Sequence, residues 1–167
     1  LTGEAVLAAS GGGEAAPGCI RLQPGQGLIG NALVQRVTIL ANNTAVDPRY
    51  LADANGEYPM PTTQAEIAIP MIADGEVIGV LDVHSPYLNA FTRNEKTVLE
   101  ALAAEIAVAI ARGQQLAWQR EQAWLTAAQL QVAETIGRGG ELGDIVTAVS
   151  RLTPMLLGLE FCAILLW

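Results

Sequence analysis

One glycine-rich stretch of the sequence has the spacing of a phosphate-binding turn. GQGLIG, residues 25–30, fits the pattern GxGxxG, in which glycines let a pyrophosphate group approach the N-terminus of a helix. The helical pattern after it lasts only about two turns, and a hairpin follows instead of a second crossover. This context favours a tight turn into a short packed helix over dinucleotide binding.

The end of one apolar strand carries two further candidates for chemistry. His84 is the only histidine of the chain, so histidines alone cannot build a triad or a metal site here. It could ligate a haem, but its isolation favours a hydrogen-bonded polar group at a strand end. Asp82 lies inside the same apolar strand and needs a partner, for which we expect a backbone group or an arginine.

The two cysteines are far apart and do not form a CxxC pair. Cys19 and Cys162 fit a reducing cytoplasm with two inert thiols. The sequence shows no nucleophile–base pair and no metal-ligand motif. We therefore predict that the protein is not an enzyme, has no metal site and requires no cofactor.

The charge of the chain excludes several classes of partner. Seventeen acidic residues face nine basic ones, and the net charge is −8. Such a surface repels phosphate groups, so we expect neither nucleic-acid binding nor attachment to an anionic membrane. The longest apolar stretch is too short for membrane insertion. Because 51% of the residues are apolar, a packed core is expected.

The elements that must position these residues follow from local patterns. Short strands are predicted over residues 4–9, 19–23 and 37–41, with a helix after residue 27. Residues 42–64 form a long polar loop of the kind that is usually functional. Two apolar runs flank Ala-Asp-Gly-Glu, residues 73–76, and predict a hairpin that is covered on both faces.

A long helical pattern follows the hairpin. Thr92 and Glu95 have the spacing of a capping box, and apolar residues then recur at helical spacing. The pattern fits either one helix of about forty residues or two helices with a joint near Gly113. A second amphipathic helix over residues 144–158 and a closing strand, EFCAILLW, complete the chain.

Several segments together resemble the GAF domain, a small-molecule-sensing module of signalling proteins. They are PGQGLIGNALVQRVTILANN, VDPRYL, EIAIPMIADGEVIGVLDVHS and NAFTRNEKTVLEALAAEIAVAIA. The resemblance implies an α+β fold, with terminal helices on one face of a central, mostly antiparallel sheet and a loop-covered pocket on the other. It covers residues 1–112, without the family's first helices and strand. Residues 113–137 are then a linker helix, and residues 138–167 resemble the opening helix and strand of a GAF domain.

The resemblance also implies a place for the ligand. The pocket should lie under the short helix and the long loop, with the hairpin as its floor. Whether Ile67 and Ile69 or their alternates Ala68 and Pro70 face it stays open. The residues expected to contact a ligand are Leu28, Ile29, Ala32, Asp47, Tyr50, Ile67, Ile69, Leu81 and Val83.

Three specialised subgroups of the family do not fit. The cyclic-nucleotide signature is incomplete, since Asn89, Phe91 and Glu95 stand at the wrong spacing without the lysine. The cysteine followed by histidine that attaches a bilin is missing. The methionine-sulfoxide reductase subgroup needs several cysteines in the pocket loops, where this chain has at most one.

We therefore expect a sensory module of a cytoplasmic bacterial signalling protein, such as a sensor histidine kinase of a two-component system with tandem GAF domains. Its partners would be a small molecule and a second copy that pairs through the long helix. The alternative is a ligand-free structural relay and dimerisation module; a haem sensor or an enzyme is less favoured. We also predict that EFCAILLW pairs beside EAVLAAS, residues 4–10, within one chain or between two swapped chains.

Overall fold

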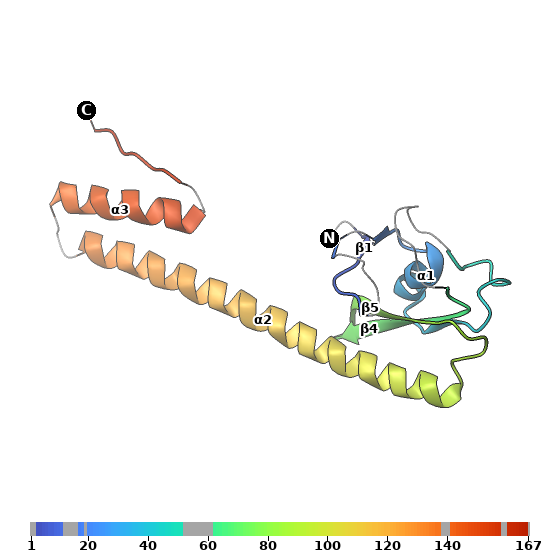
Figure 1. Cartoon of the computed structure of the whole chain (residues 1–167). Coiled ribbons are helices and arrows are strands. Elements are labelled where there is room, and N and C mark those ends of the chain that lie inside the picture. The colour runs from blue at the N-terminus through green and yellow to red at the C-terminus, as the bar shows by residue number, and fades with distance from the viewer. Residues whose placement is uncertain are drawn as a thin grey trace. The chain divides into compact units, whose positions relative to one another are not determined.

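The computed structural model describes residues 3–11, 17–18, 20–51, 62–137, 141–157 and 160–166. The chain divides into two compact units, Leu1–Arg112 and Gly113–Trp167, with the boundary inside helix α2, Arg93–Gly137 (Figure 1). Each unit is described by itself. None of the described helices is long and apolar enough to cross a membrane.

The first unit contains two antiparallel sheets. Strands β1 (Ala5–Val6) and β2 (Arg21–Leu22) form a small ladder, in which Ala5 lies opposite Leu22. Both are shorter than the strands predicted over residues 4–9 and 19–23. The larger sheet has the order β3 (Ile39–Ala41), β4 (Ala65–Ala73) and β5 (Glu76–Ser85), and both of its pairings are antiparallel.

The predicted hairpin between β4 and β5 is confirmed. Asp74 and Gly75 form its turn, and both have positive φ angles, 50° and 80°. Two central residues in this conformation match the right-handed twist of the strands that they join. Further along the hairpin the register shifts, because Ile72 pairs with Val77 while Met71 pairs with Gly79. Ile78 is therefore the extra residue of a β-bulge.

Helix α1, Gly27–Gln35, covers one face of the larger sheet and is the helix predicted after residue 27. Gly30 of the GxGxxG pattern lies against the preceding turn, where a Cβ atom would come within 2.4 Å of the Gln23 carbonyl oxygen. The pattern thus has a packing reason that involves no phosphate. The apolar core on this face consists of Leu28, Ala32, Ile39, Ala41 and Ala68.

The first turns of helix α2 cover the opposite face. The predicted capping box is formed, since the Glu95 carboxylate accepts a hydrogen bond from the Thr92 amide at 3.0 Å. The Thr92 hydroxyl oxygen in turn accepts one from the Asn94 amide at 3.2 Å. Both faces of the hairpin are thereby covered. The core on the α2 side contains Ala65, Ile67, Ile69, Phe91 and Ala103, with Leu81, Val83 and Leu99 packed against it.

Helix α2 runs as one helix of 45 residues, without a break at Gly113. The second unit contains its later turns and helix α3, Leu142–Leu157. The closing strand predicted over residues 160–167 is wrong for residues 161–166, which form no ladder. The described elements of this unit are helices, which offer no strand edge for pairing. The expected pairing of this segment with residues 4–10 stays a prediction.

Candidate functional site

Three polar side chains gather on the α1 side of the hairpin. In the β4–β5 ladder Glu66 lies opposite His84, and Ala68 lies opposite Asp82. Because side chains alternate along a strand, these four residues share one face. Ala68 belongs to the core beneath α1, which identifies the face. We call Glu66, Asp82 and His84 the acidic–histidine cluster.

His84 links the cluster to the end of the long loop. Its Nε2 lies 2.5 Å from Asp82 Oδ2, and its Nδ1 lies 2.9 Å from the Thr63 hydroxyl. Thr44 fixes this end of the loop, because its amide donates to the Gln64 carbonyl and its hydroxyl to the Thr63 carbonyl at 2.7 Å. The imidazole is thus held at both nitrogen atoms. The expectation that His84 has satisfied hydrogen bonds is confirmed. The expectation that Asp82 pairs with a backbone group or an arginine is wrong, because its partner is this histidine.

The electrostatics of the cluster are unusual for a protein surface. Glu66 is only 5% exposed. Burial, followed by the negative charge of Asp82, raises the pKa of Glu66 to about 8, although the nearby His84 acts in the opposite direction. Burial lowers the pKa of His84, but the hydrogen bond and charge of Asp82 outweigh this effect, so the net shift is upward. The cluster therefore retains protons that isolated side chains would lose.

One atom of the cluster lacks a partner. Asp82 Oδ1 is buried and accepts no hydrogen bond from the described part of the chain. A buried carboxylate oxygen without a donor is costly, so such an atom needs a partner, and a proton shared with Glu66, a water, a ligand or a bound cation would each supply one. A cavity of about 260 Å³ adjoins the cluster at His84. Its lining consists of Thr62, Thr63, His84, Ser85 and Pro86.

A larger groove of about 400 Å³ lies on the α2 side of the sheet. Its charged groups already have partners: Lys96 pairs with Glu100 at 3.8 Å, and Arg36 donates to the Gly75 carbonyl. Glu100 also accepts a hydrogen bond from the Thr38 hydroxyl at 2.5 Å. This mutual pairing leaves no described charge in the groove that needs a ligand, so we place the candidate site at the acidic–histidine cluster.

The residues predicted to contact a ligand divide between the two faces of the sheet. Leu28, Ile29, Ala32 and Tyr50 lie in or against the α1-side core. Ile67, Ile69, Leu81 and Val83 lie in or against the α2-side core. The two groups cannot line one cavity. Of the alternate positions, Ala68 lies on the α1 side, so the predicted residues do not all share one face, and which of them contact a ligand stays a prediction.

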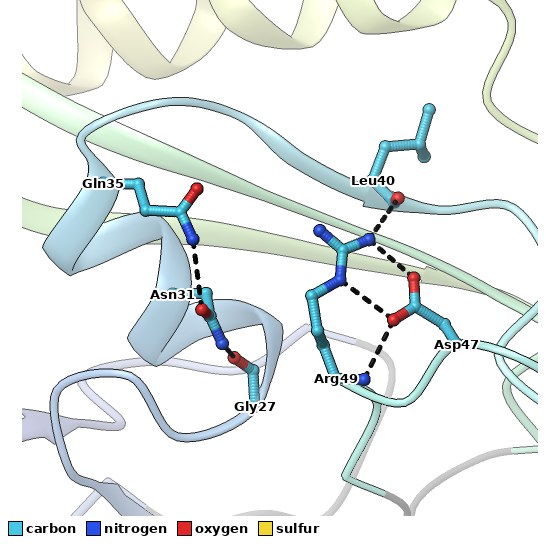
Figure 2. A network of polar contacts seen from close by, with 6 residues as sticks. All are labelled: Gly27, Asn31, Gln35, Leu40, Asp47 and Arg49. Atoms are coloured by element: carbon cyan, nitrogen blue, oxygen red, sulfur yellow. Dashed lines mark hydrogen bonds and ion pairs between the residues drawn. The ribbon is translucent and has the colours of Figure 1, made fainter.

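Asp47, the ninth predicted residue, is held by its own loop. Figure 2 shows its two carboxylate oxygens facing the Arg49 guanidinium, at 2.6 Å and 2.9 Å. The Arg49 side-chain hydrogen bond lowers the pKa of Asp47. Arg49 also donates to the Leu40 carbonyl at 3.2 Å, which ties the loop to strand β3 (Figure 2). Asp47 thus stabilises the start of the loop.

Asn31 performs a similar task for helix α1. Its side-chain amide donates to the Gly27 carbonyl at 2.7 Å, and its oxygen accepts from Gln35 (Figure 2). The same amide also donates to the Gly25 carbonyl at 3.0 Å. These bonds hold the turn of the GxGxxG stretch to the helix. The polar side chains around α1 therefore support the scaffold, and the acidic–histidine cluster remains the candidate site.

Glu66 is the functional candidate that the sequence analysis missed. The available signal was an acidic residue inside the apolar run AEIAIP, comparable with Asp82 in the partner strand. Its position opposite His84 depends on the bulge at Ile78. In a regular ladder without the bulge, counted from the two-residue turn, Glu66 would lie opposite Val83. Its side chain would then point to the face opposite that of His84.

Comparison with known proteins agrees with this architecture. The family model described as "GAF domain" matches residues 2–110, which is more than half of the chain. The chain belongs to the GAF domain family. The α+β fold predicted from the resemblance is confirmed. The match covers one GAF domain, so a tandem arrangement within this chain is not supported.

Curated relatives of this GAF chain include proteins of different kinds. It is 30% identical over 97 residues to "Protein YtsP" of Bacillus subtilis, covering 58% of this chain and 55% of the relative. It is 32% identical over 81 residues to "GAF domain-containing protein A" of Dictyostelium discoideum, covering 48% of each. It is 27% identical over 89 residues to "Free methionine-R-sulfoxide reductase" of Escherichia coli, covering 53% and 50%. The chain thus spans about half the length of these relatives.

Solved structures with the same fold include a GAF domain from a phosphoenolpyruvate-protein phosphotransferase of Coxiella burnetii. It has a TM-score of 0.54 and 26% identity, with 60% of this chain and 58% of that chain covered. The free methionine-R-sulfoxide reductase of Neisseria meningitidis, solved with its substrate, has a TM-score of 0.51 and 26% identity, with 59% and 55% covered.

These relatives correct the prediction that the protein is not an enzyme. That prediction rested on the lack of a nucleophile–base pair and of a metal-ligand motif in the sequence. The reductases of E. coli and N. meningitidis show that domains similar to this chain in sequence and fold do perform catalysis. The lack of conventional catalytic motifs in a GAF-like domain therefore does not exclude enzymatic activity.

Proposed function

We propose that this GAF domain is the small-molecule-binding, regulatory part of a larger cytoplasmic signalling protein, and that its ligand binds at the acidic–histidine cluster. The observation that carries the proposal is the buried Asp82 Oδ1, which accepts no hydrogen bond from the described residues, beside an almost fully buried Glu66. A ligand that offers a donor or a positive charge would satisfy both groups.

The surroundings of the cluster support binding. The cavity of about 260 Å³ reaches His84, and its other lining groups include two threonines and a serine, which can donate or accept hydrogen bonds. This volume suits a compact polar metabolite and is small for a nucleotide. A ligand there would contact the end of the long loop and the hairpin together, and so could shift the equilibrium between two states of the sheet.

The proposal is tested by thermal unfolding of the purified chain with a panel of free amino acids and their oxidised forms, together with native mass spectrometry for a co-purified ligand. We expect stabilisation by at least one compound in the wild type and its loss in Glu66→Gln. Glu76→Gln makes the same chemical change at an exposed position near the hairpin turn and should behave as the wild type. Stabilisation that persists in Glu66→Gln would contradict the proposed site.

A second candidate function is reduction of free methionine-R-sulfoxide, favoured by the likeness to the two reductases. A thiolate would take the sulfoxide oxygen and become a sulfenic acid, and a second thiol would release water by forming a disulfide. The chain offers Cys19, which lies outside the described residues, and Cys162. Turnover with a dithiol reductant that is lost in Cys19→Ser would support this candidate. Equal product formation in a variant lacking both cysteines would exclude it.

A structural relay is the alternative that helix α2 favours. Beyond Gly113 this helix exposes large apolar side chains, with Leu116 at 48%, Trp118 at 62% and Leu130 at 60%. Apolar side chains in these numbers along one helix favour pairing with a second helix. A homodimer through α2 would join two such domains whether or not each binds a ligand.

A further inference from the structure

The acidic–histidine cluster has the composition of a metal site. Two carboxylates and one imidazole are ligands that Zn²⁺ and neighbouring divalent ions accept, whereas Ca²⁺ and Mg²⁺ prefer oxygen atoms alone. Counting histidines in the sequence did not suggest such a site, because only one of the three ligand groups is a histidine.

The positions of the three groups also suit an ion. One ligand atom from each of Glu66, Asp82 and His84 lies within 4.8 Å of the other two. Ligand atoms about 2.0–2.2 Å from a tetrahedral ion are separated by about 3.4 Å. Small side-chain rotations on two rigid neighbouring strands would therefore bring the three atoms to coordination distance.

Two further observations point to a bound cation. Glu66 is more than nine-tenths buried, and its carboxyl group has a hydrogen-bonding relation only with Asp82, another acid, among the described residues. Asp82 Oδ1 is buried and has no donor among the residues that the structure describes. Two carboxyl groups in this environment need either a shared proton or a cation between them.

The surroundings of His84 would orient it as a ligand. Its Nδ1 lies 2.9 Å from the Thr63 hydroxyl, which could accept the Nδ1 proton while Nε2 turns from Asp82 Oδ2 to a metal. Such an outer hydrogen bond fixes the tautomer of most metal-binding histidines. The cavity beside His84 would leave a coordination position open for water or a small ligand.

We propose that Glu66, Asp82 and His84 form a binding site for one divalent transition-metal ion of the Zn²⁺ class. The inference rests on the site of the proposed function, but metal binding is measured without any metabolite. A result without metal binding would therefore not contradict metabolite binding at the cluster. A result without metabolite binding would likewise not contradict metal binding.

The decisive experiment uses the tag-free wild-type chain after treatment with a chelator. Because His84 is the only histidine, the imidazole nitrogen signals in an NMR spectrum belong to it alone. Titration with Zn²⁺ should shift the Nε2 signal until one equivalent has been added. Unchanged imidazole signals at saturating Zn²⁺ would overturn the proposal without any variant.

Competition with a chromophoric chelator gives the contribution of each ligand. We expect Glu66→Gln and His84→Gln to weaken Zn²⁺ binding at least about tenfold, because loss of even an outer-shell partner of a metal ligand lowers metal affinity about 10–100-fold. Glu76→Gln and Cys162→Ser are the matched controls and should bind as the wild type does. Wild-type affinity in both cluster variants, or loss of binding in Cys162→Ser, would overturn the proposal. Circular dichroism shows whether each variant is folded. If a variant is not folded, the NMR titration of the wild-type chain tests the proposal instead.

Discussion

At the scale of single residues, Glu66 combines an acidic side chain with a place in the middle of an apolar strand. Its pKa of about 8 in the folded chain, against 4.5 in the unfolded one, means that the folded chain binds this proton more tightly. The raised pKa of His84 acts in the same direction. Both contributions are complete at low pH and are lost as the pH rises through the folded-state pKa values.

The metal-free chain should therefore become less stable between about pH 5 and pH 8, with a slope of at most about 1.4 kcal/mol per pH unit for each proton involved. Urea unfolding at several pH values, in the presence of a chelator, measures this slope. Glu66→Gln should flatten it, because glutamine is neutral throughout. Stability that rises over this range, or an equal slope in the variant, would contradict the described cluster.

Gly30 gives a second prediction at this scale. A methyl group at this position would lie 2.4 Å from the Gln23 carbonyl oxygen and 2.9 Å from the Gly25 nitrogen, both backbone atoms. Gly30→Ala should therefore lower the free energy of unfolding by about 1–3 kcal/mol. Gly113→Ala is the control, since open space surrounds that position in a helix. It should raise stability by up to about 1 kcal/mol. Chemical denaturation compares the two, and a neutral Gly30→Ala would show that the turn is looser than described.

At the scale of elements, the start of helix α2 depends on its capping box. Thr92→Ala removes the hydroxyl that accepts from the Asn94 amide and should cost about 1 kcal/mol. Thr97→Ala removes a hydroxyl that donates to the Arg93 carbonyl inside the helix and should have little effect. Thermal unfolding distinguishes them. Equal effects of the two substitutions would mean that the cap does not stabilise the helix.

Local patterns were sufficient for those elements whose signals lie within a few residues. Thr92 and Glu95 predicted the helix start, the Asp-Gly turn predicted the hairpin, and apolar spacing predicted α1. The face that each hairpin residue occupies was not predictable, because apolar residues occur on both faces of β4 and β5. A bulge then changes the register beyond Ile72. The cluster depends on that register, so Glu66 had no visible connection with His84 in the sequence.

The closing segment shows a different limit. EFCAILLW has the composition of a buried strand, but a strand forms only beside another edge. The composition of the segment indicates that it favours an extended strand, but it does not indicate whether a neighbouring strand is available for pairing. In the same way, the apolar stripe thinned around Gly113 and left open whether α2 breaks there, whereas the helix is continuous.

At the scale of the whole molecule, the oligomeric state should depend on helix α2. Leu116 and Leu130 are exposed and stand two heptads apart, so they share one side of the helix. We expect the wild type to sediment as a dimer and the double variant Leu116→Glu/Leu130→Glu as a monomer. Gln114→Glu/Gln129→Glu adds the same charges at exposed polar positions and should stay dimeric. A monomeric wild type at micromolar concentration would exclude pairing through this helix.

The single extra residue at Ile78 has a consequence for how such a site could change over time. If Ile78 were retained but paired with Met71 in a regular ladder from the turn, Glu66 would lie opposite Val83. The carboxyl group of Glu66 and the pair formed by Asp82 and His84 would then point away from each other, on opposite sides of the sheet. Loss of the Ile78 codon itself would leave Glu66 opposite His84, so the cluster would stay assembled, whereas straightening the bulge with Ile78 retained would disperse the same ligand groups over two faces.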